Sequence, residues 1–301
     1  MNSLRDQRQV TRSNVHLEEH TFQWLRSFIY EKTGIHFQES KKYLLESRLG
    51  HRLAMLHLPD FDAYVELLRS AAALRELPHL INSITINETY FFRNEAHLSC
   101  LESSILPDLV ARRESDGTFC VRFWSAACST GDETYTIAMV VHHLLAPRYP
   151  HVRFEVVGTD INTDVLSSAR RGVYGGRSVR CVPEAYLARY FREESGQFVI
   201  SDEIRDMVRF EQMNLCDGAT VARMRNVDVI VCANVLIYFN KGSKQLALAS
   251  LHQALADHGY LLIGASEALN GGHPFTASHH GKSIVYQKLS SPSLSLHPYA
   301  Q

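Results

Sequence analysis

The segment from residue 121 to residue 160 constrains the fold of this chain more than any other. An apolar strand pattern at 121–124 is followed by a loop of small residues, a helix pattern at 133–145 and a second apolar strand that ends at Asp160. This order is typical of α/β proteins that bind a nucleoside, because small residues let the backbone approach the ligand and the terminal acid can accept both ribose hydroxyls. The G-x-G-x-x-G spacing of dinucleotide sites is absent and only Gly131 remains, so S-adenosylmethionine fits better than NAD.

Apolar residues recur at helical spacing before this segment. One stripe contains Phe22, Leu25, Phe28 and Ile29, and another contains Leu45, Leu49, Leu53 and Leu56. We therefore expect a small all-α domain at 17–82, preceded by a disordered polar segment at 1–16. A connecting segment at 83–100 is expected to contribute to the site.

Strand and helix patterns alternate after Thr118, which predicts an α/β domain at 101–289 with a doubly wound parallel sheet. The expected strands lie at 120–124, 154–159, 207–212, 227–232 and 260–264. The expected helices lie at 133–145, 164–171 and 243–257, the last of them ending before Gly259. The alternation lapses at 172–205, where a short helix at 183–191 and a strand at 197–200 are expected, and the Ser/Pro-rich residues 290–301 predict a flexible tail.

Composition excludes several classes of protein. The formal net charge of −1 provides no field for nucleic acid, and no run of about 18 apolar residues predicts a membrane span. The polar residues 1–19 lack the apolar core of a secretory signal. Six scattered cysteines without a C-x-x-C pair predict free thiols in a reducing compartment, and sixteen histidines without an H-E-x-x-H pattern predict no metal site. We expect a cytoplasmic monomer that binds no nucleic acid and does not insert into membranes.

Three motifs occur in order along the chain: T-I-N-E-T-Y-F-F-R at 85–93, S-A-A-C-S-T-G at 125–131 and N-V-L-I-Y-F at 234–239. Together they resemble the chemotaxis receptor methyltransferase (CheR) family, which transfers methyl groups from S-adenosylmethionine to receptor glutamates. The resemblance runs from about residue 22 to residue 288. It implies a Rossmann-like methyltransferase sheet with a small β-subdomain inserted at 172–205, and the cytoplasmic helices of methyl-accepting chemotaxis receptors as partners.

The resemblance also implies the site residues. Cofactor contacts are expected at Asn87, Thr89, Arg93, Glu133, Asp160, Asn214, Leu215, Ala233 and Asn234. Arg93 would also face the incoming glutamate and Tyr238 would supply a hydroxyl, so both are catalytic candidates. The family usually has arginine where this chain has Ala233, which puts the strength of cofactor binding or substrate docking in doubt. A glutamate is already ionised near neutral pH, so no general base is expected.

Two of these acids also have purely structural interpretations. Asp160 could cap the helix that begins near residue 164, although four residues is too far for a direct cap. Glu133 could simply complement the dipole of the helix in whose first turn it lies.

Lys41, Arg48 and Arg52 fall within about 20° of one line on the helix expected near residues 40–58. Spacing alone favours an ordinary solvated helix face. The family docks on acidic receptor helices through arginines of this helix, and Arg48 and Arg52 match such positions. We therefore expect substrate docking by these two residues and by Lys41 on the same line. In some members the β-subdomain binds a tethering peptide of the receptor; the short acidic loop at 193–196 predicts no such binding here.

Three other functions remain open from the sequence. A non-catalytic regulatory module that binds cofactor or receptor would show no methyl transfer. An NAD-dependent oxidoreductase would need the missing glycine-rich fingerprint. A methyltransferase of small carboxylates would leave the basic helix without a purpose.

Overall fold

The computed structural model describes residues 15–269, 271, 273–280 and 283–288. The tail expected at 290–301, and all but the last two residues of the disordered segment expected at 1–16, lie outside these residues. The chain divides into two compact units between Ile86 and Asn87. No helix within the described ranges is both long and apolar enough to cross a membrane.

The first unit is helical, as the sequence predicts. Its helices are α1 (Glu19–Thr33), the 3-10 turn η1 (Glu39–Lys41), α2 (Lys42–Leu56), α3 (Phe61–Arg69) and α4 (Ala73–Ile84). Their apolar faces share one core, whose fully buried members include Phe22, Leu25, Ile29, Leu45, Leu49, Leu53 and Tyr64. The two stripes read from the sequence supply most of these side chains, because residues three and four apart lie on one face of a helix.

A buried charged cluster joins α2, α3 and α4 in this unit. Arg52 donates from Nε to Oε1 of Glu76 at 2.6 Å and from Nη2 to Oε2 at 2.6 Å. The hydroxyl of Tyr64 donates to Oε1 of Glu76 at 2.9 Å, and the side chains of Arg52 and Glu76 are only 11% and 5% exposed. The expectation that Arg52 lies on a solvated docking face is therefore wrong, because its guanidinium is buried and paired with the carboxylate of Glu76.

The other two docking candidates differ from Arg52 in exposure. Lys41 is exposed at the end of η1, directly before α2, and Arg48 is half-buried and donates from Nη1 to the carbonyl oxygen of Ile84. The backbone spacing that aligns the three residues thus places them in three different environments.

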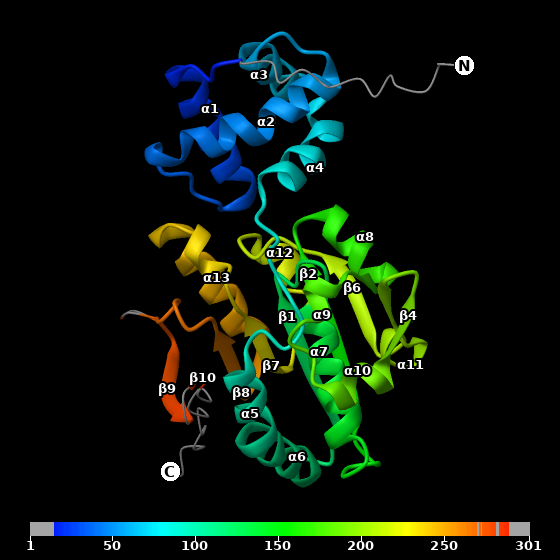
Figure 1. Ribbon diagram of the computed structural model, residues 1–301. Coiled ribbons are helices and arrows are strands. Elements are labelled where there is room, and N and C mark those ends of the chain that lie inside the picture. Colours follow the sequence, from blue (N-terminus) through cyan, green and yellow to red (C-terminus); the bar gives the residue numbers. More distant parts are fainter. Residues whose placement is uncertain (1–14, 270, 272, 281–282, 289–301) are drawn as a thin grey trace, which may run out of the picture. The chain divides into compact units, whose positions relative to one another are not determined.

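The second unit is built on a seven-stranded sheet in the order β6-β2-β1-β7-β8-β10-β9 (Figure 1). The strands are β1 (Cys120–Ala126), β2 (Arg153–Asp160), β6 (Val208–Gln212), β7 (Val227–Cys232), β8 (Leu255–Ile263), β9 (Phe275–His280) and β10 (Ser283–Lys288). The first five are mutually parallel, which confirms that part of the prediction. Strand β10 is antiparallel to both β8 and β9, and neither β9 nor β10 was expected from the sequence.

Helices cover both faces of this sheet. They are α5 (Glu95–Cys100), the π-helical turn η2 (Leu101–Ile105), α6 (Leu106–Ser115), α7 (Asp132–Val140), the π-helical turn η3 (Val141–Leu145), α8 (Thr163–Arg171), α12 (Gly218–Val221), the 3-10 turn η4 (Leu236–Tyr238) and α13 (Lys241–Ala254). The last helix was expected to continue to residue 257, but β8 begins at Leu255. Gly259 marks an irregularity in β8 rather than a helix stop: a Cβ there would lie 2.9 Å from the carbonyl oxygen of Ala256.

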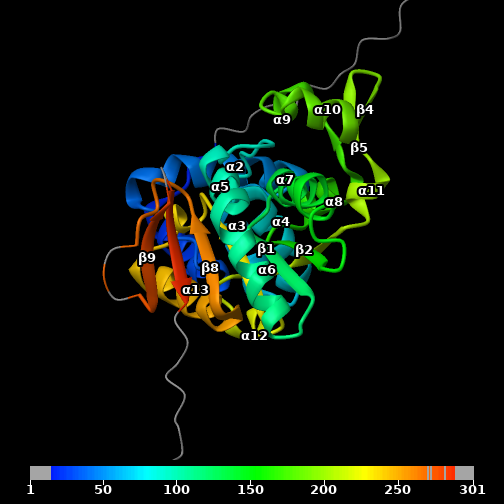
Figure 2. The same cartoon turned by 90° about the horizontal axis from the view of Figure 1, so that it is seen from below.

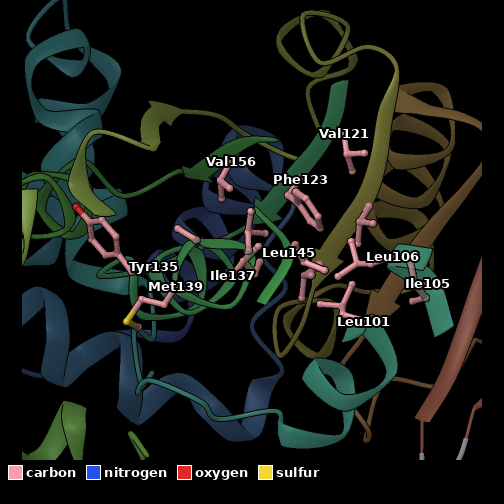
Figure 3. Close-up of a cluster of buried hydrophobic side chains, with 14 of the residues drawn as sticks. Leu101, Ile105, Leu106, Val121, Phe123, Tyr135, Ile137, Met139, Leu145 and Val156 are labelled. Carbon is pink, nitrogen blue, oxygen red and sulfur yellow. The ribbon is translucent and has the colours of Figure 1, made fainter. Parts of the chain in front are cut away.

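The side chains of β1 alternate between two cores. Val121 and Phe123 pack on one face with residues of η2, α6 and α7, and Figure 3 shows them beside Leu106, Ile137 and other members of that cluster. Trp124 and Ala126 belong to the opposite cluster, which α13 covers. Burial on both faces explains the near-continuous apolar sequence of this strand and confirms the doubly wound architecture.

A second sheet of three antiparallel strands lies between α8 and β6 in the sequence. It contains β3 (Val173–Tyr174), β5 (Gln197–Ile200) and β4 (Phe191–Glu194), with short helices α9 (Gly176–Val179), α10 (Glu184–Tyr190) and α11 (Asp202–Arg205). Figure 2 shows β4 and β5 extending away from the seven-stranded sheet. This is the expected β-subdomain.

Candidate functional site

The loop after β1 has an unusual backbone. Ala127, Ser129 and Gly131 adopt φ angles of 65°, 50° and 88°, a left-handed region that non-glycine residues rarely occupy. The amide of Cys128 donates to the carbonyl oxygen of Thr159 at 2.8 Å and ties the loop to the end of β2. Because such conformations persist only where the surroundings impose them, and cluster at ligand sites, the loop is a candidate ligand cradle.

Asp160 ends β2 and anchors this loop. It is 7% exposed; its Oδ2 accepts from the amide of Ser129 at 2.8 Å and its Oδ1 accepts from the amide of Asn162 at 2.9 Å. Burial raises the pKa of Asp160, and the backbone amides oppose that rise. Asn162, and not Asp160, caps α8, so the capping interpretation of Asp160 is wrong. A carboxylate accepts about four hydrogen bonds, so Asp160 can still accept from a ligand.

Glu133 lies half-buried in the first turn of α7, directly after the loop. The hydroxyl of Ser125 donates to its Oε1 at 2.8 Å. Burial raises the pKa of Glu133 to about 7; Ser125 and the positive charge of Arg93 oppose this rise, and the negative charge of Glu267 adds to it. The site therefore has an acid poised near neutrality, with a cation and a second carboxylate close by.

The segment that carries the first motif is connected to the same loop. The hydroxyl of Ser129 donates to the carbonyl oxygen of Asn87 at 3.0 Å, and Thr89 is half-buried. The side chain of Arg93 is exposed and donates from Nη1 to the carbonyl oxygen of Glu88 at 2.7 Å. Phe91 is fully buried in the core. Thus the buried Phe91 anchors the segment to the core, and the side chain of Arg93 is exposed to solvent.

The ends of β6 and β7 carry the remaining candidates. Oδ1 of Asn214 accepts from the amide of Cys216 at 2.9 Å, and Leu215 is 5% exposed within the core on the α13 side. Ala233 is half-buried against the opposite core. Asn234 adopts a φ of 64°, and its amide donates to Oε2 of Glu267 at 2.6 Å.

The parallel strands bring most of these residues together. The carboxyl ends of β1, β2, β6 and β7 meet at one edge of the sheet, where Glu133, Asp160, Asn214 and Asn234 follow them. Tyr238 lies half-buried in η4, four residues further along the loop that starts at Asn234. The docking candidates Lys41, Arg48 and Arg52 belong to the other unit.

Sequence reasoning missed Glu267 at this edge. Its side chain is buried and its Oε2 also accepts from the amide of Gly264 at 2.8 Å. The sequence does place this acid four residues beyond the end of β8, the fifth parallel strand, but Glu267 belongs to none of the three motifs.

The chemistry of this edge fits S-adenosylmethionine. Carboxylates at Glu133 and Asp160 can accept from ribose hydroxyls and an ammonium group, and they complement a positively charged ligand rather than a pyrophosphate. In the described part of the chain, no group of three His, Cys, Asp or Glu side chains could hold a metal ion.

Comparisons with known proteins agree with this chemistry. The model of the CheR methyltransferase all-alpha domain matches residues 20–85, and the model of the CheR methyltransferase SAM binding domain matches residues 87–284. SAM is S-adenosylmethionine, which is therefore the cofactor of this chain.

Three relatives are similar over most of their length. Chemotaxis protein methyltransferase 2 of Vibrio cholerae is 37% identical over 81% of this chain and 84% of its own. Chemotaxis protein methyltransferase 2 of Pseudomonas aeruginosa is 36% identical over 92% and 95%. The chemotaxis protein methyltransferase of Escherichia coli is 34% identical over 83% and 85%. With two family models covering the helical unit and the sheet, and relatives this similar along nearly the whole chain, the protein belongs to the CheR methyltransferase family.

Proposed function

We propose that this methyltransferase transfers the methyl group of S-adenosylmethionine to glutamate side chains of methyl-accepting chemotaxis receptors, or of related signalling receptors, and forms glutamate methyl esters. The distribution of charge at the site carries the proposal: Glu133 is half-buried, burial raises its pKa, and the positive charge of the exposed Arg93 opposes that rise. Acidic groups lie inward, where they complement the positive charge of the cofactor, and a cation lies outward, where it complements an anionic acceptor.

The reaction needs little proton chemistry from the protein. The cofactor supplies an activated methyl group on a sulfonium, and the acceptor carboxylate is already ionised near neutral pH. Arg93 and Tyr238 would orient the carboxylate, while Asp160, Asn214 and Asn234 would hold the nucleoside. Charge is neutralised as the reaction proceeds, so a site with little water favours it, and accurate alignment is the main requirement.

The acceptor would be recognised by the helical unit. We assign docking on acidic receptor helices to Lys41, the last residue of η1, and to Arg48 of α2, while the Arg52–Glu76 pair holds α2 against α4. We place the protein in the cytoplasm, where the signalling helices of receptors lie, and expect it to act as a monomer.

A labelling experiment tests the proposal. The protein is incubated with S-adenosylmethionine carrying a radioactive methyl group and with membranes of its host, and the labelled band is identified. Carboxyl methyl esters release volatile methanol in mild alkali, whereas methylated amines do not. We expect label on a receptor-sized protein that alkali releases as methanol. Alkali-stable label, or label on small molecules alone, would contradict glutamate methylation of receptors.

A further inference from the structure

Glu267, in the segment after β8, is a carboxylate buried among backbone amides. It is 3% exposed. Its Oε2 accepts from the amides of Asn234 at 2.6 Å and Gly264 at 2.8 Å, and its Oε1 accepts from the amide of Ile237 at 3.2 Å. Two of these three amides belong to the loop that follows β7, more than 25 residues away in the sequence.

The loop needs such a partner for two reasons. Asn234 adopts a left-handed backbone conformation, which asparagine tolerates better than most residues but which persists only where its surroundings hold it. Ile237 is the second residue of η4, and the first amides of a helical turn have no acceptor inside it. A carboxylate that accepts hydrogen bonds from the amides of both Asn234 and Ile237 satisfies these two donors and holds the loop in one conformation.

The chain makes room for this carboxylate. A Cβ at Gly264 would lie 2.6 Å from Oε2 of Glu267 and 3.1 Å from the amide nitrogen of Asn234. Any side chain at this position would displace the carboxylate, the loop or both. Gly264 and Glu267 therefore act together: the glycine leaves the space in which the carboxylate accepts hydrogen bonds from the loop amides.

We infer that Glu267 is the positioning residue of the loop after β7: it fixes Asn234 for the cofactor and the η4 turn that carries Tyr238 for the acceptor. The inference rests on the proposed function for the roles of Asn234 and Tyr238, while the clamp itself rests on the hydrogen bonds. Glu267 is not a catalytic residue, because its described contacts are to the protein backbone.

Two variants of Glu267 and a matched control test the inference. Glu267→Ala removes both acceptor oxygens and all three hydrogen bonds, whereas Glu267→Gln keeps one amide oxygen for Asn234 and Gly264 and turns an NH2 group toward the amide of Ile237. Asp228→Asn is the control for destabilisation away from the loop: Asp228 is 2% exposed, accepts from the amide of Arg122 at 2.8 Å and from Nε of Arg113 at 3.0 Å, and lies at the start of β7, at the other end of the strand.

The first readout needs no substrate. Hydrogen–deuterium exchange of peptides covering residues 233–239 should be fastest in Glu267→Ala, intermediate in Glu267→Gln and unchanged in Asp228→Asn. If the alanine variant does not fold, the glutamine variant and the control carry the comparison. If residues 233–239 exchange at the wild-type rate in both Glu267 variants, the inference is overturned.

The second readout separates positioning from general stability. In single-turnover methylation at saturating cofactor, Glu267→Ala should be slower by roughly a hundredfold, since misplacement by about 1 Å costs that much. Its affinity for S-adenosylhomocysteine should fall less than its rate, and Asp228→Asn should match wild type in both. Equal losses of rate in Glu267→Ala and Asp228→Asn would reduce Glu267 to a structural residue. If wild type methylates no receptor glutamate while the exchange differences hold, the proposed function fails and the clamp stands.

Discussion

Removing Arg52 should destabilise the helical unit severely, although the sequence places this residue on a basic helix face. Arg52→Met leaves the carboxylate of Glu76 and the hydroxyl of Tyr64 buried without their cation. Breaking one side of a buried ion pair costs about 3–5 kcal/mol. For a domain of this size each kcal/mol lowers the unfolding midpoint by about 4–8 °C, so a decrease of at least roughly 12 °C is expected.

Replacing the whole cluster should restore stability. In the triple variant Arg52→Met, Glu76→Leu and Tyr64→Phe, no polar group of the cluster remains buried without a partner. Apolar replacements of complete buried ion pairs are often neutral or stabilising. Lys41→Met is the matched control, since this exposed lysine should change stability by no more than about 0.5 kcal/mol.

Hydrogen exchange of α2 and α4 in the full chain, measured over a denaturant series, reads the stability of this unit separately from the sheet. The triple variant also isolates docking, because it lacks Arg52 and keeps the fold. We expect it to methylate receptor at the wild-type rate. If Arg52→Met is no less stable than Lys41→Met, the buried-pair argument is refuted; if the stable triple variant loses methylation, Arg52 docks the receptor after all.

Four further predictions concern the site and the β-subdomain. Asp160→Ala should weaken S-adenosylhomocysteine binding by about 1–3 kcal/mol, roughly tenfold to a hundredfold, measured by calorimetry; an unchanged dissociation constant in a folded variant would remove Asp160 from the site. Because burial raises the pKa of Glu133 to about 7, its anion is scarce at pH 6 and dominant at pH 8. Cofactor binding that requires this anion should strengthen about tenfold over that range with release of a proton, and Glu133→Gln should abolish the dependence. Arg93→Ala should slow single-turnover methylation on the order of a hundredfold, with Tyr238→Phe milder, and the rate with bound cofactor should barely change between pH 6 and 8; a steep rise would reveal a general base. Titration with the C-terminal peptides of host receptors should give no measurable binding to the β-subdomain, and micromolar affinity would show that a tether is used.

The parallel part of the fold could be predicted because its strands are buried on both faces. The sequences of β1 and β7 are almost entirely apolar, and the small-residue loop after β1 is a local signal. Strands β9 and β10 could not be found in this way. The F-T-A-S-H-H sequence of β9 is mostly polar and half exposed, because β9 is an edge strand.

Individual side chains were predictable where position along a strand decides their environment, and not where a distant partner does. Asp160 and Asn234 follow strand ends, which places them at one edge of the sheet once the strands are parallel. Arg52 has the spacing of a surface cation, but helical periodicity does not say that α4 brings Glu76 beside it. Glu267 meets the amide of Asn234 across 33 residues of sequence.

The position of β1 between β2 and β7 has a consequence for how the protein folds. β1 pairs with β2 about 30 residues later, but Phe123 pairs with Val229, more than 100 residues further along the chain. Closing so long a loop is slow, and folding rates fall as contacts become less local. The part of the candidate site around Asp160 can therefore form early. The part around Asn234 is completed only after β7 has paired with β1. A nascent or truncated chain that ends before β7 would expose the apolar edge of β1, which makes release of such fragments an aggregation hazard.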